Sequence, residues 1–456
     1  MLKIVDKYLE MDNVNLYELA KSYGTPIVVF SERRILENLK SVNDLKNIYS
    51  KLEIYYAVKA CSNISILKII RGADLGVEVS SIGELFKACV AGFKADNIIF
   101  NGPAKKLKEI ELAVRLGVKC INVDSMSELI KISHTANRLG KPVNIALRVD
   151  VPVRSNGIAI KSAGTKFGVD VKDIDSLIDF ILKSKYLNLT GLHVHIGSQN
   201  TCLESWIRSA EFLSSIYSMI EGRGIRLQHI NLGGGLPVDY AHNAQDISPI
   251  FKPLISDYEI VNSVANTLRR SIGDVEIYLE PGRRIIANTS ILLSSIEAIK
   301  LKNGERWIII DAGWNILNSV RVLRWYYEVT SVNKANAEEF SSYRIGGPLC
   351  DGNDVFHDLQ GESQGNPILP KYRLLPKYLE VGDVIAILDV GAYLLDLMNN
   401  FNGYLKPEVL MIKLNRDVVS IRSREKLIDL VAGEVDAEGL KEAYKVLEML
   451  ISYEKS

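Results

Sequence analysis

The sequence predicts an α/β protein in which a TIM-like (β/α)8 barrel is joined to a second, mostly β domain. Three observations lead to this prediction. The chain of 456 residues is too long for one ordinary hydrophobic core. Short β-rich runs alternate with longer helical patterns between residues 53 and 287, as expected of a (β/α)8 barrel. Beyond residue 288 the β-rich runs continue with little helix between them.

The barrel strands are predicted from short apolar runs, which are 53–58, 75–79, 97–101, 119–123, 143–149, 189–196, 227–232 and 276–280. The helices predicted in this region are 62–72, 81–92, 105–117, 125–140, 171–184, 203–222 and 249–273. Serines that can serve as N-caps and glycines that can end helices mark several of them: Ser62, Ser81, Ser125, Gly72, Gly92, Gly117 and Gly140. Alternation does not show that a sheet closes, so a doubly wound open sheet is the alternative fold.

The second domain is predicted from strand-like runs at 290–300, 306–311, 342–345, 384–389 and 408–414. The run 26–30 precedes the barrel and is expected to join this domain. We therefore predict a barrel domain over residues 34–287 and a β-rich domain built from residues 1–33 and 288–456. An amphipathic helix over 437–451 is predicted to be a packing or dimer element.

Composition narrows the class of protein. The chain is 47% hydrophobic and 24% charged, and its 55 basic residues balance 55 acidic ones, so no global charge favours nucleic acid or an anionic membrane. The five cysteines are scattered without metal-binding spacing, which indicates reduced thiols and no metal site. Without a signal-like or membrane-spanning apolar segment, we expect a cytoplasmic protein.

Lys59 is the first residue that suggests chemistry. It directly follows the predicted strand 53–58, where an ammonium group is costly to bury. A lysine that forms a Schiff base works best where desolvation lowers its pKa, which gives one reason for this placement. The alternative is an ordinary lysine whose ammonium reaches water from the strand end.

Other strand ends supply groups that suit pyridoxal 5′-phosphate. A barrel gathers the ends of its strands at one mouth. There the sequence places Glu280, as a carboxylate for the pyridine nitrogen, and His195, as a flat ring for stacking, with Ser198 as a polar contact. The triple glycine 233–235 and Arg283 suit a phosphate. A tight glycine turn, a structural histidine or an exposed arginine would each explain one motif, but these explanations would have to coincide at several strand ends.

The chain resembles the fold-type III pyridoxal-phosphate-dependent decarboxylases, the group that contains diaminopimelate and eukaryotic-type ornithine decarboxylases. The resemblance rests on motifs spread over nearly the whole chain: YAVKA at 56–60, GVEVSSIGEL at 76–85, HVHIGSQ at 193–199, NLGGG at 231–235, EPGR at 280–283, GPLCD at 347–351 and GAY at 391–393. It implies a homodimer whose active sites are shared between subunits and completed by the β-rich domain.

The resemblance also implies roles for individual residues. Lys59 would carry the cofactor as a Schiff base, and Cys350 would enter from the neighbouring subunit as the acid that protonates the reacting carbon. Lys59, Cys350 and His195 would be catalytic. The residues expected to contact the cofactor are Lys59, Glu78, His195, Ser198, Gly234, Gly235, Glu280, Gly282, Arg283 and Tyr393.

The sequence departs from diaminopimelate decarboxylases where the family places a substrate-binding arginine. Ser319 stands there, and a hydroxyl cannot replace a bidentate guanidinium. The residues expected to bind the substrate are Asp351, Arg321, Arg324 and Tyr393. We therefore expect a decarboxylase for an amino acid with another distal polar group, free or carrier-bound, in specialised metabolism of the siderophore, antibiotic or polyamine type.

Several alternatives stay open. Meso-diaminopimelate decarboxylase of lysine biosynthesis is the first, and an ornithine or lysine decarboxylase is the second. A catalytically inactive regulator of this fold would be expected to lose cofactor groups that this chain retains. An alanine racemase shares the domain plan, but it usually has arginine at the position of Glu280.

Overall fold

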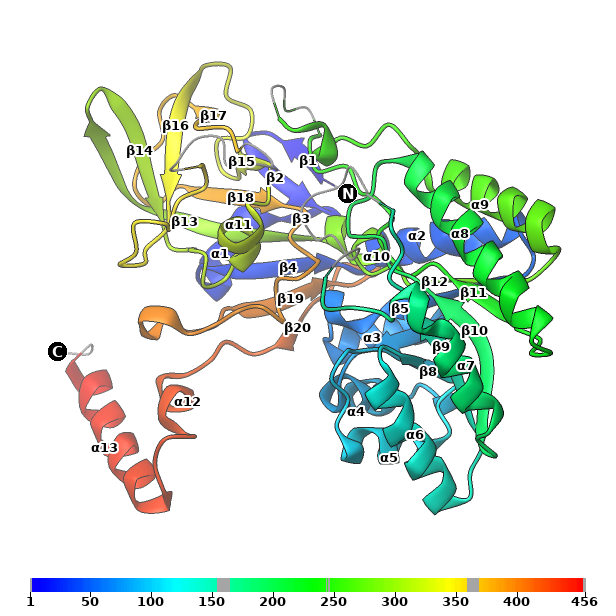
Figure 1. Cartoon of the computed structure of the whole chain (residues 1–456). Helices are drawn as coiled ribbons and strands as arrows, with labels where there is room; N and C mark the ends of the chain where they lie inside the picture. The colour runs from blue at the N-terminus through cyan, green and yellow to red at the C-terminus, as the bar shows by residue number, and fades with distance from the viewer. Residues whose placement is uncertain (1, 154–164, 243, 245–246, 359–368, 454–456) are drawn as a thin grey trace.

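The computed structural model describes residues 2–153, 165–242, 244, 247–358 and 369–453 (Figure 1). Its first domain is a closed barrel of eight parallel strands in the order β10-β11-β12-β5-β6-β7-β8-β9. These strands are β5 (Leu52–Ala57), β6 (Gly76–Val79), β7 (Ile98–Phe100), β8 (Cys120–Val123), β9 (Val143–Arg148), β10 (Leu187–His193), β11 (His229–Asn231) and β12 (Glu276–Leu279). The predicted barrel is confirmed, and the open sheet is excluded because β12 pairs with β5.

Helices surround the barrel. They are α2 (Glu32–Asn43), α3 (Ile64–Gly72), α4 (Ile82–Ala91), α5 (Leu107–Leu116), α6 (Met126–Leu139), α7 (Ile174–Leu182), α8 (Leu203–Gly222), α9 (Asp257–Ile272) and α10 (Arg283–Ile286). Ser81 and Ser125 cap α4 and α6 as predicted, because their hydroxyls accept hydrogen bonds from backbone N–H groups three residues on. The cap predicted at Ser62 was wrong: the amide oxygen of Asn63 accepts those bonds at the start of α3.

The predicted helix 249–273 was too long. Only a 3-10 turn at Pro249–Phe251 and α9 from Asp257 occupy that stretch. Ser256 caps α9 in a capping box with Glu259, so the helix begins where the side chains satisfy its first N–H groups.

The second domain is centred on a nine-stranded sheet. Its main path runs β17-β16-β14-β13-β4-β19-β20, and β18 pairs with both β13 and β15. The strands are β4 (Ile27–Ser31), β13 (Ser290–Lys302), β14 (Glu305–Ile310), β15 (Val329–Ser331), β16 (Phe340–Gly346), β17 (Arg373–Pro376), β18 (Val384–Leu388), β19 (Glu408–Ile412) and β20 (Val418–Arg422). The run predicted at 26–30 joins this sheet as β4, between β13 and β19.

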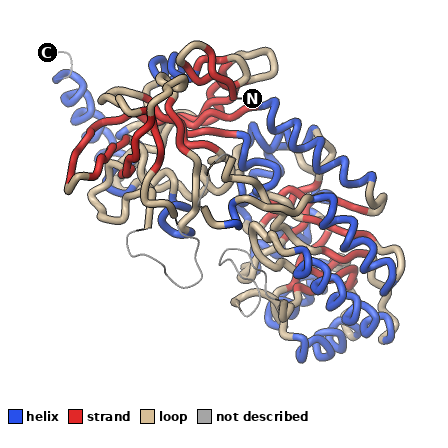
Figure 2. The backbone as a smooth tube through the Cα atoms, turned by 90° about the horizontal axis from the view of Figure 1, so that it is seen from above, coloured by secondary structure: helices blue, strands red, loops and turns tan. Residues whose placement is uncertain are grey.

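Smaller elements complete this domain. A three-stranded sheet is formed by β1 (Leu2–Val5), β2 (Tyr8–Met11) and β3 (Val14–Asn15), and the helices are α1 (Leu16–Tyr23), α11 (Asn318–Leu323), α12 (Leu427–Val431) and α13 (Ala437–Tyr453). Figure 2 shows the β strands of this domain to one side of the barrel, with α13 extending away from both. Among the described residues, no helix has the length and apolar character needed to cross a bilayer.

The two domains meet beside the mouth of the barrel. The backbone N–H of Tyr393, just beyond β18, donates to the carbonyl of Ala60 at 2.7 Å. A Cβ on Gly391 would overlap the carbonyl oxygen of Ile286, so only glycine permits this close approach of the chains. The junction therefore brings Tyr393 of the β domain next to the turn that carries Lys59.

Candidate active site

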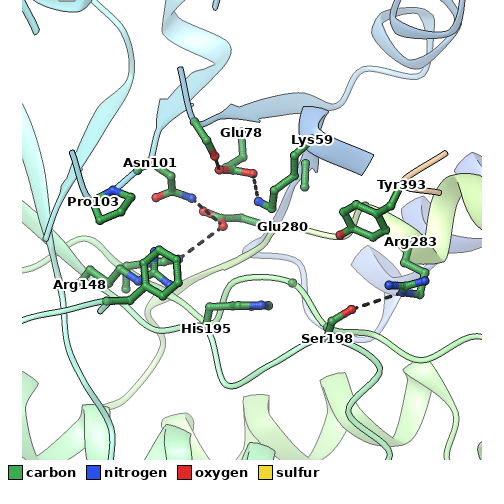
Figure 3. A pocket seen from close by; sticks show the side chains of 18 of the residues that line it. Lys59, Glu78, Asn101, Pro103, Arg148, His195, Ser198, Glu280, Arg283 and Tyr393 are labelled. Carbon is green, nitrogen blue, oxygen red and sulfur yellow. Dashed lines mark hydrogen bonds and ion pairs between the residues drawn. The ribbon is translucent and has the colours of Figure 1, made fainter. Parts of the chain in front are cut away.

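A cavity of about 380 Å³ lies at the carboxyl ends of the barrel strands (Figure 3). Such a mouth is where barrel enzymes hold their active sites. The ten residues expected from the sequence to contact a cofactor all line it: Lys59, Glu78, His195, Ser198, Gly234, Gly235, Glu280, Gly282, Arg283 and Tyr393. Tyr393 comes from the β domain, so both domains contribute to the cavity wall.

Lys59 is positioned by a 3-10 turn, Val58–Ala60, that follows β5 directly. Its Nζ lies 2.5 Å from Oε2 of Glu78, a fully buried carboxylate at the end of β6, and the two side chains point toward each other in Figure 3. Burial opposes the charge on Lys59, but Glu78 and Glu280 outweigh it and raise the pKa of the lysine. Desolvation therefore does lower this pKa, as the sequence suggested, but the nearby acidic groups more than offset it.

Glu280 follows β12 and is held by two amides. Nδ2 of Asn101 donates to its Oε2 at 3.0 Å, and Nδ2 of Asn231 donates to its Oε1 at 2.8 Å. Nε2 of His193 lies 3.4 Å from Oε2. Burial opposes the charge, but His193, Lys59 and Asn231 lower the pKa of Glu280 to about 2. The carboxylate is therefore ionised near neutral pH.

Glycines form one wall of the cavity. A Cβ on Gly234 would overlap the carbonyl oxygen of Glu280, and a Cβ on Gly235 would overlap that of Gly197. Gly235 also has a φ of +116°, which side chains rarely permit. At Gly282 a Cβ would lie 2.8 Å from that of Ala60. Only glycine allows these backbones to come so close, and it leaves their N–H groups open to a ligand.

Arg283 lies beside the glycine wall and is buried. Its guanidinium donates to the hydroxyl of Tyr240 at 2.9 Å and to Oγ of Ser198 at 3.3 Å (Figure 3 shows the second bond). Among the described residues, its hydrogen-bond partners are hydroxyl groups, and no carboxylate forms an ion pair with it. A buried cation with only neutral partners is costly unless an anion joins it, so this corner of the cavity suits a phosphate.

His195 extends into the cavity and lies among Arg148, Arg283 and Lys59 (Figure 3). Burial, together with the nearby Arg148 and Lys59, lowers the pKa of His195 to about 3, so its ring is neutral. A neutral flat ring can stack on an aromatic ligand without adding charge. Arg148 also lines the cavity, and its guanidinium lies over the ring of Phe167 at 4.3 Å and 3.6 Å from Asp124.

Four residues expected to act on the substrate do not line this cavity: Cys350, Asp351, Arg321 and Arg324. Cys350 is exposed. Asp351 accepts a bond from Nε1 of Trp314 at 3.1 Å and lies 3.6 Å from Arg321. Arg324 is paired with Asp358, to which its Nε donates at 2.6 Å. These residues therefore lie on the β domain, apart from the cavity.

Sequence reasoning assigned no role to several side chains around Glu280 and Arg283. Asn231 and His193 stand within quoted motifs and Asn101 ends the predicted strand 97–101, so their places at strand ends were the signal that could have identified them. Tyr240 and Trp325 gave no comparable signal, because Tyr240 lies in a loop of the barrel domain and Trp325 lies in the β domain. The described residues contain no cluster of three or more metal-ligating side chains.

The cavity thus offers an amine, an ionised carboxylate, a neutral ring and an anion-binding corner, a combination that fits pyridoxal phosphate. Residues 34–287 match the pyridoxal-binding domain of the pyridoxal-dependent decarboxylases. The chain belongs to this family. The decarboxylase is 34% identical to the diaminopimelate decarboxylase of Archaeoglobus fulgidus over 94% of this chain and 98% of that one. It is 31% identical to that of Methanocaldococcus jannaschii over 95% and 96% of the two chains.

Solved structures agree with the sequence relatives. The diaminopimelate decarboxylase of M. jannaschii has a TM-score of 0.85 and 30% identity, with 96% of this chain and 98% of that chain covered. The Helicobacter pylori enzyme, solved with L-lysine, has a TM-score of 0.80 and 30% identity, with 92% and 99% covered. The protein is therefore a pyridoxal-phosphate-dependent carboxy-lyase whose substrate is an amino acid. When bound, the cofactor withdraws electrons from the bond between the α-carbon and its carboxylate.

Proposed function

We propose that this decarboxylase is a diaminopimelate decarboxylase, which releases one carboxylate of meso-diaminopimelate as CO2 and leaves L-lysine. The observation that carries the proposal is similarity over almost the full length to enzymes of that activity, two of them solved with L-lysine. The comparisons favour this activity, which the sequence left as an alternative, over the specialised role that was first expected.

We propose the following roles for the cavity residues. Lys59 holds the cofactor through its amine, and Glu280 accepts a hydrogen bond from the pyridine nitrogen. The ionised state of Glu280 supports this role, because a carboxylate keeps that nitrogen protonated. His195 stacks on the pyridine ring of the cofactor. Glu78 keeps the amine of Lys59 protonated before the cofactor binds.

The phosphate would occupy the corner formed by the glycines and Arg283. The backbone at Gly234, Gly235 and Gly282 leaves room for it, and Arg283 supplies the positive charge. Ser198 and Tyr393 line the same part of the cavity and would add hydroxyl donors.

We further propose a homodimer in which Cys350 of one protomer completes the active site of the other. Cys350 is exposed and lies apart from the cavity of its own protomer, although its backbone N–H is fixed by Oδ1 of Asn402 at 2.8 Å. In this arrangement Cys350 delivers a proton to the carbon that has lost its carboxylate. Asp351 and Arg321, held together beside Trp314, would face the distal end of the substrate.

One observation favours a second candidate, a decarboxylase for an amino acid with a different distal group. Ser319 replaces the arginine expected in a diaminopimelate decarboxylase, and its hydroxyl is 2.7 Å from that of Tyr327 rather than facing the cavity. A substrate without a distal carboxylate would need no guanidinium at this position.

Release of CO2 from a panel of free amino acids distinguishes the two candidates. The panel contains meso-diaminopimelate, ornithine, lysine, arginine and derivatives of glutamate. We expect kcat/KM for meso-diaminopimelate to exceed that for each other compound by about 100-fold or more. A substrate with a different distal group would leave polar side chains of the site without hydrogen-bond partners, which raises the free energy of the transition state. A higher value for any other member would overturn the proposed substrate and support the second candidate.

A further inference from the structure

Arg283 is enclosed by aromatic rings from both domains. The guanidinium carbon lies 3.7 Å from the ring centroid of Trp325 and 4.8 Å from that of Tyr393. Trp325 is 1% exposed and belongs to the β domain, whereas Arg283 follows the last barrel strand. The shorter distance is that of a guanidinium stacked on an indole, an attraction that strengthens when both groups are removed from water.

The indole of Trp325 is itself held in place. Tyr240 and Phe251 meet it edge-on, with centroid distances of 5.2 and 5.4 Å and interplanar angles of 80° and 82°. Both rings are fully buried, and both come from the segment between β11 and α9 of the barrel. Trp325 therefore sits in a rigid aromatic socket and cannot turn without displacing two other rings.

The backbone before Trp325 also fixes its position. The preceding residue, Arg324, ends α11 in the left-handed region with a φ of 50°, which is uncommon for a residue other than glycine. The ion pair of Arg324 with Asp358 and the bond from the N–H of Trp325 to the carbonyl of Ser319, at 3.1 Å, hold this turn. The turn directs the chain so that Trp325 reaches the barrel.

We propose that Trp325 is a positioning residue for the phosphate-binding arginine: its indole fixes the plane of the Arg283 guanidinium so that donors face the cavity. The hydrogen bonds to Tyr240 and Ser198 occupy part of the donor set, and the remaining N–H groups are left for an anion. This inference rests on the proposed function, which places the cofactor phosphate at Arg283. It adds that the β domain, through one indole, determines how tightly the barrel holds that phosphate.

The test compares the affinity of the apoenzyme for pyridoxal 5′-phosphate with its affinity for pyridoxal, which lacks the phosphate. Trp325→Leu keeps an apolar side chain but removes the aromatic π face. Trp325→Phe keeps an aromatic π face that is smaller than that of indole. We expect Trp325→Leu to weaken pyridoxal phosphate binding about tenfold or more and pyridoxal binding less than about twofold, with Trp325→Phe between wild type and Leu. Inorganic phosphate should compete with pyridoxal phosphate less well in Trp325→Leu than in the wild type.

A matched control is available in the same domain. Trp307 also stacks under an arginine, with the guanidinium carbon of Arg344 at 4.0 Å from its ring, but Arg344, unlike Arg283, does not line the cavity. Trp307→Leu should leave the ratio of the two affinities unchanged. Equal weakening of both ligands in Trp325→Leu, or an unchanged ratio, would overturn the proposal.

A third variant separates this inference from the proposed function. Arg283→Gln removes the charge itself and should abolish the preference for the phosphorylated ligand. If Arg283→Gln changes the ratio and Trp325→Leu does not, the phosphate site stands and the role of Trp325 is refuted. If neither variant changes the ratio, the assignment of the phosphate to Arg283 fails, and the inference fails with it.

Discussion

The ammonium of Lys59 and the carboxylate of Glu78 form a charged pair at the mouth of the barrel, with Nζ 2.5 Å from Oε2. The hydroxyl of Ser80 donates to the other oxygen of Glu78 at 2.8 Å, which keeps this carboxylate in place. The pair raises the pKa of Lys59 against the effect of burial. In the proposed function the neutral amine of Lys59 is the nucleophile, so the pair with Glu78 would disfavour the reactive form of the lysine until the cofactor enters.

We predict that Glu78→Gln lowers the pKa of Lys59. With the carboxylate gone, less remains to offset the effect of burial, so the neutral amine appears at lower pH. The pH profile for the rate at which the apoenzyme takes up pyridoxal phosphate, followed by visible absorbance, should shift to lower pH by about one unit or more. Ser80→Ala, which retains the carboxylate, should shift the profile less. A shift of the Glu78→Gln profile to higher pH would contradict this account.

Replacement of the lysine tests the covalent attachment. We predict that Lys59→Ala loses the visible absorbance of the bound cofactor, and that borohydride reduction labels no peptide in this variant. Lys166→Ala provides the control, because Lys166 also lines the cavity and carries an amine. Its reduced protein should still carry the label on Lys59. If mass mapping finds the label on another side chain in the wild type, the role proposed for Lys59 fails.

The barrel could be predicted because its parallel strands are buried on both faces and are read as short apolar runs. Closure could not, since it depends on pairing between residues such as Ile277 and Leu52, which are far apart in sequence. In the β domain, β15, β17 and β20 are among the strands that were missed. Of these, β17 and β20 are edge strands: β20 is exposed or half-buried along its whole length, and β17 has only four residues, beginning with Arg373 and ending with Pro376, so neither sequence shows a continuous apolar run.

The cavity could be predicted for a related reason. Residues such as Lys59 and Glu280 follow strands directly, and a barrel gathers all such positions at one mouth. The rings around Arg283 could not be predicted in this way. Trp325 reaches the guanidinium from the other domain through a turn at Arg324, and no spacing in the sequence encodes that contact.

The ionised carboxylate of Glu280 leads to a prediction for catalysis. We expect Glu280→Gln to reduce kcat by about 100-fold or more while the cofactor stays bound, because an amide cannot hold the pyridine nitrogen protonated. Steady-state rates and the absorbance of bound cofactor should be measured on the same preparation. Asn231→Ala removes one donor to Glu280 and retains its charge, so its kcat should fall less. A kcat for Glu280→Gln equal to that of wild type would refute the role of the carboxylate.

The exposed position of Cys350 leads to a prediction about assembly. If each active site combines Lys59 of one protomer with Cys350 of the other, Lys59→Ala and Cys350→Ala homodimers should both be inactive. A mixture of the two should recover activity, since a heterodimer has one site in which both residues are intact. About a quarter of the wild-type rate is expected after full exchange of equal amounts. Subunit exchange should be verified with distinguishable tags, and no recovery after verified exchange would rule out shared sites.

His229 provides a prediction for stability. It is 2% exposed, its ring stacks on Tyr278 at 4.2 Å, and burial lowers its pKa to about 3. An unfolded histidine has a pKa of about 6.5, so between these values only the unfolded chain binds the proton. The contribution of His229 to the free energy of unfolding is therefore fully present above pH 6.5. It falls by about 1.4 kcal/mol per pH unit as the pH decreases toward 3.

Urea unfolding of wild type and His229→Gln between pH 7.5 and pH 4.5 measures this effect. At pH 7.5 His229 is neutral in both states, so the difference between the two proteins there reports only the lost packing against Tyr278. Below pH 6.5 the midpoint of the variant should decrease less steeply with pH than that of the wild type, because glutamine cannot take up the proton. Parallel pH dependence of the two midpoints would show that His229 is protonated in the folded protein as readily as in the unfolded chain.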